Sequence, residues 1–174
     1  TFKEIATEAG VSANESGTMV SGMGCDFKDF NNDGFIDVFH SDLPTQIFAL
    51  FLNLKGRMFQ YAGPAAGLSR LSYRMGGWSN AFIDYDNDGW KDIYSANGDV
   101  DDLSENARQS DTMFENLEGK DFKDVSSELG KDFAARGFHR GSAFADLNND
   151  GNINVLDLEL LARYYRTSGP IAWQ

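Results

Sequence analysis

One pattern of aromatic, acidic and glycine residues occurs three times along the chain. The pattern F-x-D-x-[DN]-N-D-G-x-x-[DN] describes Phe27–Asp37, Phe82–Asp92 and Phe144–Asn154, at offsets of 55 and 62 residues. A second phrase, Phe51–Phe59, aligns with Phe114–Phe122. Self-similarity at a spacing of about 60 residues indicates supersecondary units that stack on one another. The sequence therefore predicts a repeat protein.

The repeats also define the domain organisation. We predict a single repeat domain over residues 1–174, with unit one at about 11–62, unit two at about 68–126 and an incomplete unit three at about 137–174. The segment Phe2–Gly10 aligns with Phe59–Gly67 and Phe122–Gly130, so Thr1–Ala6 is predicted to match the last strand of a preceding unit.

Each full unit contains four short runs rich in Phe, Ile, Val and Tyr, which are typical of strands. The predicted strands are Gly22–Lys28, Ile36–His40, Gln46–Asn53 and Arg57–Ala62 in unit one, and Gly77–Ile83, Lys91–Ala96, Thr112–Asn116 and Asp121–Val125 in unit two. Four short antiparallel strands per unit predict a mainly β fold of propeller blades. Closed propellers have at least four blades, so about three blades predict an incomplete or open propeller. Three explanations remain open: a fragment of a longer protein, association of chains into a ring, or an open array of blades.

The repeated pattern places oxygen-bearing side chains at alternate positions of a tight loop. The predicted ligands are Asp29, Asn31, Asp33, the Phe35 carbonyl and Asp37 in the first loop; Asp84, Asp86, Asp88, the Trp90 carbonyl and Asp92 in the second; and Asp146, Asn148, Asp150, the Asn152 carbonyl and Asn154 in the third. Converging carboxylates repel one another unless a cation lies among them. Six to eight oxygen ligands favour Ca²⁺ over Mg²⁺, and the absence of His and Cys from the loops disfavours Zn²⁺ and copper.

The loops differ in their number of carboxylates, which falls from four in the second loop to three in the first and two in the third. We therefore expect two to three calcium ions, with the second loop binding most tightly. Turns without a metal are the alternative, which three copies in register disfavour. An EF-hand needs a bidentate acid at position 12, where the first two loops carry His40 and Ser95.

The charge and the apolar pattern exclude several classes of partner. Asp plus Glu is 27 and Lys plus Arg is 15, giving a net charge of −12, which disfavours nucleic acid as the main partner. The longest apolar run, Ile47–Leu52, is too short to span a membrane. Cys25 is the only cysteine and is predicted to be a small buried hydrophobe.

The loops and the strands that precede them resemble the FG-GAP (VCBS-type) repeat of integrin-α-like β-propellers. The phrases GMGCDFKDFNNDGFIDVF, GWSNAFIDYDNDGWKDIYSANGDV and FENLEGKDFKDVSSELG carry this resemblance, which extends to about Asn154. They look most like the bacterial extracellular branch with an ASPIC/UnbV region. The resemblance implies a calcium-binding propeller that is secreted or attached to the cell surface, with the periplasm also open, and that serves in binding or adhesion.

The end of the chain differs from the repeat. In Asp146–Tyr165 an acid, Asp157, stands at position 12, and Leu158, Leu161 and Tyr165 have helical spacing. This segment resembles one calcium-loop–helix half of a dockerin, in which Asp157 would be a further ligand. Strand and helix both remain open for residues 155–166.

These features predict a calcium-stabilised extracellular module for binding or adhesion, without catalytic residues. A protein or glycan is the expected ligand, and self-association through open sheet edges is a further expectation. Trp90, at a loop tip, is predicted to face a ligand, Trp78 to pack between blades, and His139 to pair with a neighbouring Asp. The alternatives are a structural subunit that completes its sheets with other chains and a calcium-dependent carbohydrate-active enzyme.

Overall fold

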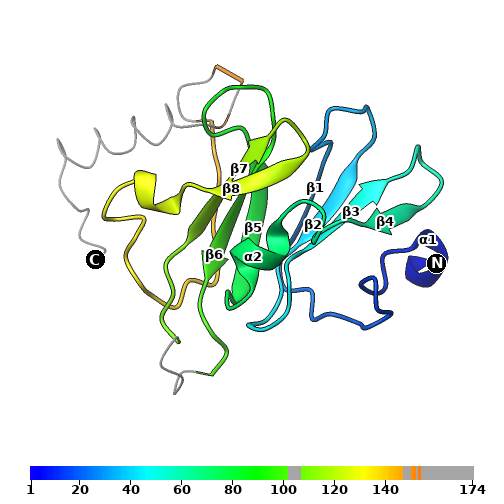
Figure 1. The fold of residues 1–174 in the computed structure, drawn as a ribbon, viewed down its shortest axis with the longest axis horizontal. Coiled ribbons are helices and arrows are strands. Elements are labelled where there is room, and N and C mark those ends of the chain that lie inside the picture. The colour runs from blue at the N-terminus through cyan, green and yellow to red at the C-terminus, as the bar shows by residue number, and fades with distance from the viewer. Residues whose placement is uncertain (102–106, 147–149, 152, 154–174) are drawn as a thin grey trace.

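The computed structural model describes residues 1–101, 107–146, 150, 151 and 153, and contains two four-stranded antiparallel sheets (Figure 1). Each strand pairs with the next one along the chain. The first sheet consists of β1 (Cys25–Lys28), β2 (Asp37–His40), β3 (Ala49–Asn53) and β4 (Phe59–Tyr61). The second sheet consists of β5 (Gly77–Ile83), β6 (Asp92–Asn97), β7 (Thr112–Leu117) and β8 (Asp121–Asp124). The short helices are α1 (Ala6–Ala9), α2 (Leu68–Ser72) and the 3₁₀ turn η1 (Ser126–Glu128).

Each sheet carries a row of apolar side chains, and the two rows occupy equivalent repeat positions. In the first sheet Phe27 is the register partner of Val38, which is also the partner of Phe51. In the second sheet Phe82, Ile93 and Phe114 form the equivalent row. Since directly opposed side chains lie on one face of a sheet, each row makes one face of its sheet apolar.

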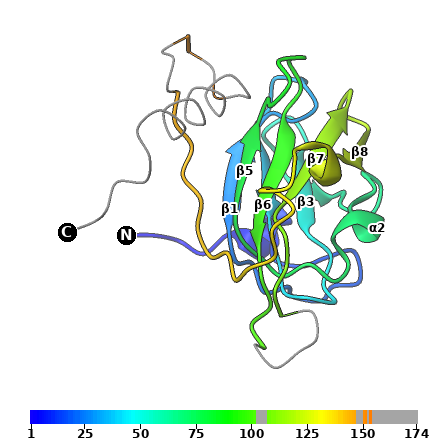
Figure 2. The same cartoon turned by 90° about the vertical axis from the view of Figure 1, so that its left-hand side faces the viewer.

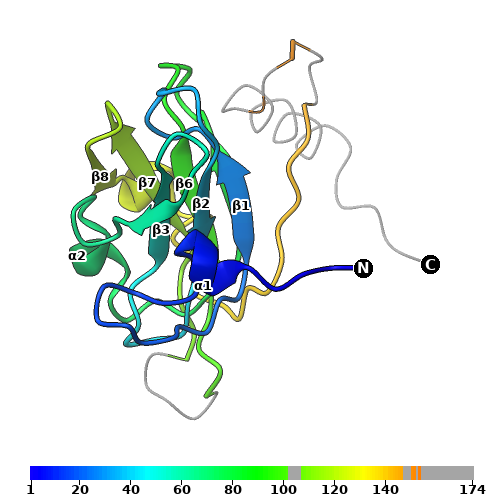
Figure 3. The ribbon, with the colours of Figure 1, turned by 90° about the vertical axis from the view of Figure 1, so that its right-hand side faces the viewer.

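The core lies between the two sheets. Phe39 and Leu50 of the first sheet are fully buried and belong to one cluster with the Phe82 row of the second sheet. The Phe39 and Phe82 rings meet edge to face, with their centroids 5.7 Å apart. Inner strands β1 and β5 are also joined, because Asp26 Oδ2 accepts the N–H of Phe82 at 2.8 Å. The sheets therefore pack as successive blades (Figure 3).

The start of the third unit packs onto the second sheet in the same way. After η1 the chain returns past β5, where Ser142 Oγ lies 2.7 Å from Ser79 Oγ (Figure 2). The Phe144 ring meets the Tyr94 ring edge to face at 5.2 Å. Phe144 and Tyr94 are the repeat equivalents of Phe82 and Phe39, so residues 141–146 take the place of a first strand.

The predicted mainly β, propeller-like fold is confirmed, and the described part of the chain forms no closed ring. All eight predicted strands are present, most of them shorter than expected. No helix in the described residues is both long enough and apolar enough to cross a membrane. The segment 155–166 lies outside the described residues.

Two sequence expectations differ from the structure: the burial of Cys25, and a last strand of a preceding unit at Thr1–Ala6, where no strand forms and α1 begins. Cys25 is exposed, so its predicted burial is wrong; it lies on a face of β1 that nothing in the described structure covers. Unit two also carries an insertion at Asn97–Ser110, and the described end of this insertion is packed, since Ala107 and Gln109 are buried. The Gln109 side chain accepts the N–H of Gly76 and donates to the Arg74 carbonyl, which ties the end of the insertion to the start of β5.

Candidate metal centre

The first two acidic loops share a tight turn that depends on an Asn-Asp-Gly sequence. In the first two loops Asn32 and Asn87 have φ of 56° and 63°, and Gly34 and Gly89 have φ of 89° and 92°. In the third loop Gly151 has φ of 89°. Positive φ is unfavourable for most side chains, but glycine adopts it freely and asparagine tolerates it. The Asn before the Asp-Gly pair thus has a backbone role, which the sequence analysis did not assign.

The first aspartate of each loop holds the turn closed. Asp29 accepts the N–H groups of Asp33 and Gly34 at 3.0 and 2.7 Å. In the third loop Asp146 accepts the N–H groups at the equivalent positions, 150 and 151, at 3.2 and 2.8 Å. In the second loop Asp84 Oδ2 accepts the N–H of Gly89 at 3.1 Å. The three loops therefore share one scaffold.

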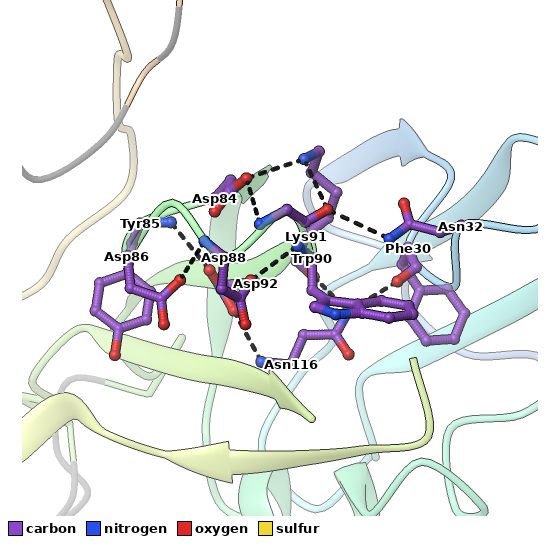
Figure 4. Close-up of polar contacts among 11 residues, drawn as sticks. Phe30, Asn32, Asp84, Tyr85, Asp86, Asp88, Trp90, Lys91, Asp92 and Asn116 are labelled. Atoms are coloured by element: carbon purple, nitrogen blue, oxygen red, sulfur yellow. Dashed lines mark hydrogen bonds and ion pairs between the residues drawn. The ribbon is translucent and has the colours of Figure 1, made fainter. Parts of the chain in front are cut away.

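Three carboxylates converge in the second loop (Figure 4). One oxygen from each of Asp84, Asp86 and Asp88 lies within 4.8 Å of the others. Asp84 Oδ1 is buried and has no hydrogen-bond partner among the described residues. A buried carboxylate oxygen without a partner is costly, and a cation would satisfy it. The donor set contains oxygen alone, so the site fits a hard cation such as Ca²⁺.

A lysine lies at the edge of this cluster. Lys91 Nζ is 3.4 Å from Asp84 Oδ2 and 3.5 Å from the Gly89 carbonyl. Ile36 occupies the equivalent position in the first loop. The lysine charge offsets part of the repulsion among the carboxylates of the second loop, where the carboxylate count is highest.

The last aspartate of each of the first two loops is buried and connects the loop to the third strand of its sheet. Asp92 accepts the N–H of Tyr85 at 2.9 Å and the N–H of Asn116 at 2.8 Å. Asp37 makes the same two contacts, with Phe30 at 3.2 Å and Asn53 at 2.8 Å. Both predicted ligands therefore also fix the sheet.

Burial shifts the titration of these two aspartates. It is the main cause that raises the pKa of Asp37 to about 6; the nearby Asp33 and Asp29 add to this shift, and the two donated N–H bonds oppose it. Burial likewise raises the pKa of Asp92 to about 7, with Asp86 and Asp88 adding to the shift. A bound cation would favour the charged form at both positions.

Two asparagines complete the loops, and neither is among the ligands predicted from the sequence. The amides of Asn53 and Asn116 donate to the carbonyls of Ile36 and Lys91, at 2.9 Å in both cases. Their side-chain oxygens accept the N–H of Gly56 and Gly119 in the following turn. The repeated Asn-Leu-x-Gly in the linking phrases was the available signal.

The first two loops also touch each other. Asn116 Nδ2 donates to the Phe30 carbonyl at 2.8 Å, and Asn32 Nδ2 donates to the Gly89 carbonyl at 3.3 Å. Trp90 lies beside Gly119, where an added Cβ would come within 2.9 Å of the ring and 2.8 Å of the Asn31 backbone. The Trp90 ring is therefore partly buried beside the turn between β7 and β8, and its role at a ligand surface stays a prediction.

Some of the predicted ligands lie in the described part of the chain, and others lie outside it. The side chains of the first two loops are all described, and the structure brings oxygens of Asp84, Asp86 and Asp88 within 4.8 Å of one another. In the third loop Asp146 and Asp150 are described, whereas Asn148, Asn152, Asn154 and Asp157 lie outside the described residues. No observation tests the carbonyls of Phe35 and Trp90 as ligands.

The predicted pairing of His139 is confirmed. Its Nδ1 lies 2.6 Å from Asp111 Oδ1, and Tyr94 Oη donates to the other oxygen of Asp111 at 2.7 Å. His40 packs against the Phe51 ring with centroids 5.7 Å apart. The Trp78 ring stacks under the Arg140 guanidinium at 4.0 Å. All these contacts join strands or units.

Comparison with known families agrees with the repeat structure. The model of the FG-GAP-like repeat matches residues 29–95 and again residues 84–156. The chain therefore belongs to the FG-GAP-like repeat family, a class of propeller-like repeat proteins often used in binding or adhesion. A search of the curated proteins finds no match.

Proposed function

We propose that this chain is a calcium-stabilised, non-catalytic binding or adhesion module of an exported protein. The observation that carries the proposal is the convergence of Asp84, Asp86 and Asp88 around a buried oxygen of Asp84 that has no hydrogen-bond partner in the described structure. The recurrence of the same turn in the first and third loops supports two to three ions, because the three loops share their scaffold.

Calcium would act on the fold through the loops. Each of the first two loops connects the first and second strands of a blade, and its last aspartate also holds the third strand. An ion that neutralises the carboxylates would fix three strands of a blade together. Extracellular modules hold calcium with dissociation constants of about 10⁻⁴–10⁻³ M, so sites of this strength would be filled at the extracellular or cell-surface location that we propose.

The binding role rests on the family rather than on a pocket. FG-GAP repeats suggest a module used in binding or adhesion, and the proposed ligand is a protein or glycan. His139 pairs with Asp111, and His40 lies against the Phe51 ring and 3.2 Å from Asp42 Oδ2; both histidines thus join neighbouring segments, which supports structural roles. The ligand is therefore proposed to bind to the surface of the blades, not to an enzymatic site.

Thermal unfolding with and without calcium tests the proposal. Each occupied site adds about 1.4 kcal/mol at a tenfold excess of calcium over its dissociation constant. The melting temperature is expected to fall in chelator and to recover with Ca²⁺ more than with equal Mg²⁺. D88N should reduce this recovery, whereas D132N, a change at an exposed aspartate outside the loops, should not. An unchanged melting temperature on addition of calcium would refute the proposal.

A further inference from the structure

Four arginines lie around the end of the insertion that follows β6. The described residues include six arginines, and four of them belong to three segments that contact one another: Arg74, Arg108, Arg136 and Arg140. Within the described residues no ion pair joins any of these four to a carboxylate, whereas Arg70 pairs with Asp121 at 2.8 Å. In a chain with a net charge of −12, this gathering of guanidinium groups is suited to an anionic ligand.

Hydrogen bonds hold the three segments together. Gln109 and Gly137 each donate their N–H to the other's carbonyl at 2.9 Å. The Gln109 side chain also donates to the Arg74 carbonyl at 3.0 Å. Arg136 Nε donates to the Arg108 carbonyl at 2.8 Å. Arg74, Arg108 and Arg136 therefore lie on one continuous surface.

Aromatic rings order two of the guanidinium groups. The Arg140 guanidinium lies 4.0 Å from the centroid of the Trp78 ring and donates to the Gly98 carbonyl at 2.9 Å. The guanidinium groups of Arg108 and Arg140 lie 5.1 and 5.8 Å from the centroid of the Phe138 ring, which is 37% exposed. Because these contacts already restrict the two side chains, a ligand would have less arginine freedom to remove.

The backbone at Arg74 is strained in a way that the insertion maintains. Arg74 has a φ of 141°, which side chains rarely adopt, and both Arg74 and Tyr73 are exposed. The Gln109 side chain that binds the Arg74 carbonyl also accepts the N–H of Gly76 at 2.9 Å, so it fixes this turn at two points. Strained backbone that its surroundings maintain is concentrated at binding sites.

This surface and the acidic loops lie at opposite ends of the second sheet. Trp78 follows the register pair Gly77–Asn97 at one end, whereas the second acidic loop follows the pair Ile83–Asp92 at the other. Figure 1 shows the acidic loops toward the top of the view and the turn after β6 toward the bottom. None of the predicted calcium ligands belongs to this surface.

The chemistry of the surface favours the carboxylates of a protein over other anions. Guanidinium groups bind carboxylates through two parallel N–H bonds. The net charge of −12 opposes nucleic acid and anionic membranes, whose charge is dense and extended. A sugar stacks on an open aromatic face, whereas arginines already cover a face of Trp78 and of Phe138. Arginine and aromatic residues together are typical of surfaces that bind proteins.

We infer that the arginine surface, defined by Arg74, Arg108, Arg136 and Arg140 around Trp78 and Phe138, binds an acidic segment of a partner protein through its Asp or Glu carboxylates. In an extended segment, carboxylates at alternate positions lie on one side about 7 Å apart, so one segment can pair with more than one arginine. The inference rests on the proposed binding function and names the class of partner. It requires no calcium ion at the surface itself.

A synthetic peptide that alternates Glu and Ser tests the inference on the calcium-loaded chain. The matched control peptide carries Gln in place of Glu. Fluorescence anisotropy at low salt should show about tenfold tighter binding of the Glu peptide, and added salt should weaken it. Equal affinity for the two peptides would overturn the inference.

Charge reversal locates the binding surface. R108E and R136E should each weaken binding of the Glu peptide about fivefold or more. R57E makes the same change in net charge at an exposed arginine between β3 and β4, and should leave binding nearly unchanged. The melting temperature of each variant confirms that it is folded. Binding that is unaffected by R108E and R136E, or equally weakened by R57E, would contradict the assignment of this surface.

Two further measurements separate this inference from its alternatives. Oligogalacturonate that binds more tightly than the Glu peptide, and loses this affinity in R108E, would overturn the inference in favour of an acidic glycan. In chelator, below the melting temperature, binding of the Glu peptide should persist. If calcium raises the melting temperature but the Glu peptide does not bind, this inference alone fails. If the peptide binds but calcium has no effect on melting, the calcium proposal alone fails.

Discussion

Asp92 binds the backbone N–H of Asn116 at 2.8 Å, and so joins the second acidic loop to the third strand of its own blade. The same carboxylate accepts the N–H of Tyr85 within the loop. Asp37 repeats both contacts with Asn53 and Phe30 in the first blade. The last aspartate of the motif therefore has a structural role that does not depend on an ion.

D92A should destabilise the protein even in chelator. The substitution leaves the buried N–H groups of Tyr85 and Asn116 without acceptors, at about 1–3 kcal/mol for each group. We expect the free energy of unfolding in denaturant to fall by roughly 2–5 kcal/mol without calcium. D88A, at an exposed aspartate of the same loop, is the matched control and should cost little in chelator. Similar losses for the two variants would contradict this role of Asp92.

K91I should tighten calcium binding at the second loop. The substitution removes a positive charge 3.4 Å from Asp84 Oδ2 and installs the residue found at the equivalent position, Ile36. The Lys91 side chain is about one-third exposed, so solvent screens its charge and the expected gain is only about two- to fivefold in the dissociation constant. Calorimetry at low salt measures it. K91R keeps the charge and should bind calcium as the parent does; equal affinity of K91I and K91R would refute the argument.

The calcium-free protein should lose stability as the pH rises from 5.5 to 8. Burial raises the pKa of Asp37 to about 6 and that of Asp92 to about 7, whereas an unfolded aspartate titrates near about 3.9. Between these values the folded state binds more protons than the unfolded state. The contribution of the two groups is therefore complete below about pH 4 and is lost as the pH rises through 6 and 7.

Melting temperatures in chelator at pH 5.5 and 8 measure this effect. Saturating calcium should remove or reverse the trend, because the ion favours the carboxylate forms. A melting temperature in chelator that is higher at pH 8 would show that burial does not dominate at these aspartates.

F30A should weaken both the fold and the first loop. Phe30 is 2% exposed, and its ring stacks on Phe82 at 6.4 Å and on Phe122 at 5.9 Å in the second sheet. Removing a buried Phe side chain costs about 3–5 kcal/mol. F35A in the same loop is a matched control, since Phe35 is less buried. Denaturant unfolding of both variants, with and without calcium, should show the larger loss for F30A under both conditions.

The strands were predictable because the same four strand-like runs occur in both full units. β5 (Gly77–Ile83) has its predicted bounds, since Gly77 and the loop aspartate Asp84 mark its ends in the sequence. β1 is shorter than predicted because Met23 and Gly24 join Ser41 through single backbone bonds outside the strand. Composition marks where a strand lies, but its length depends on the partner strand.

The site residues that the sequence did not reveal form hydrogen bonds to backbone groups of the loops and turns. Asn53 and Asn116 lie on third strands, sixteen and twenty-four residues beyond Asp37 and Asp92, and only the folded sheet brings them to the loops. Cys25 was misjudged for a related reason. Its burial depends on whether another sheet covers β1, and an alternating apolar pattern carries no information about that cover.

The aromatic pair that joins successive units also bears on how such chains change their length. The same aromatic contact, with one ring from each neighbouring unit, occurs twice: Phe82 packs on Phe39, and Phe144 packs on Tyr94. A unit gained by gene duplication would already encode both aromatic residues of this contact, one for each neighbouring unit. Lengthening or shortening the array then requires no new interface, so unit number can evolve separately from the sequence within each unit.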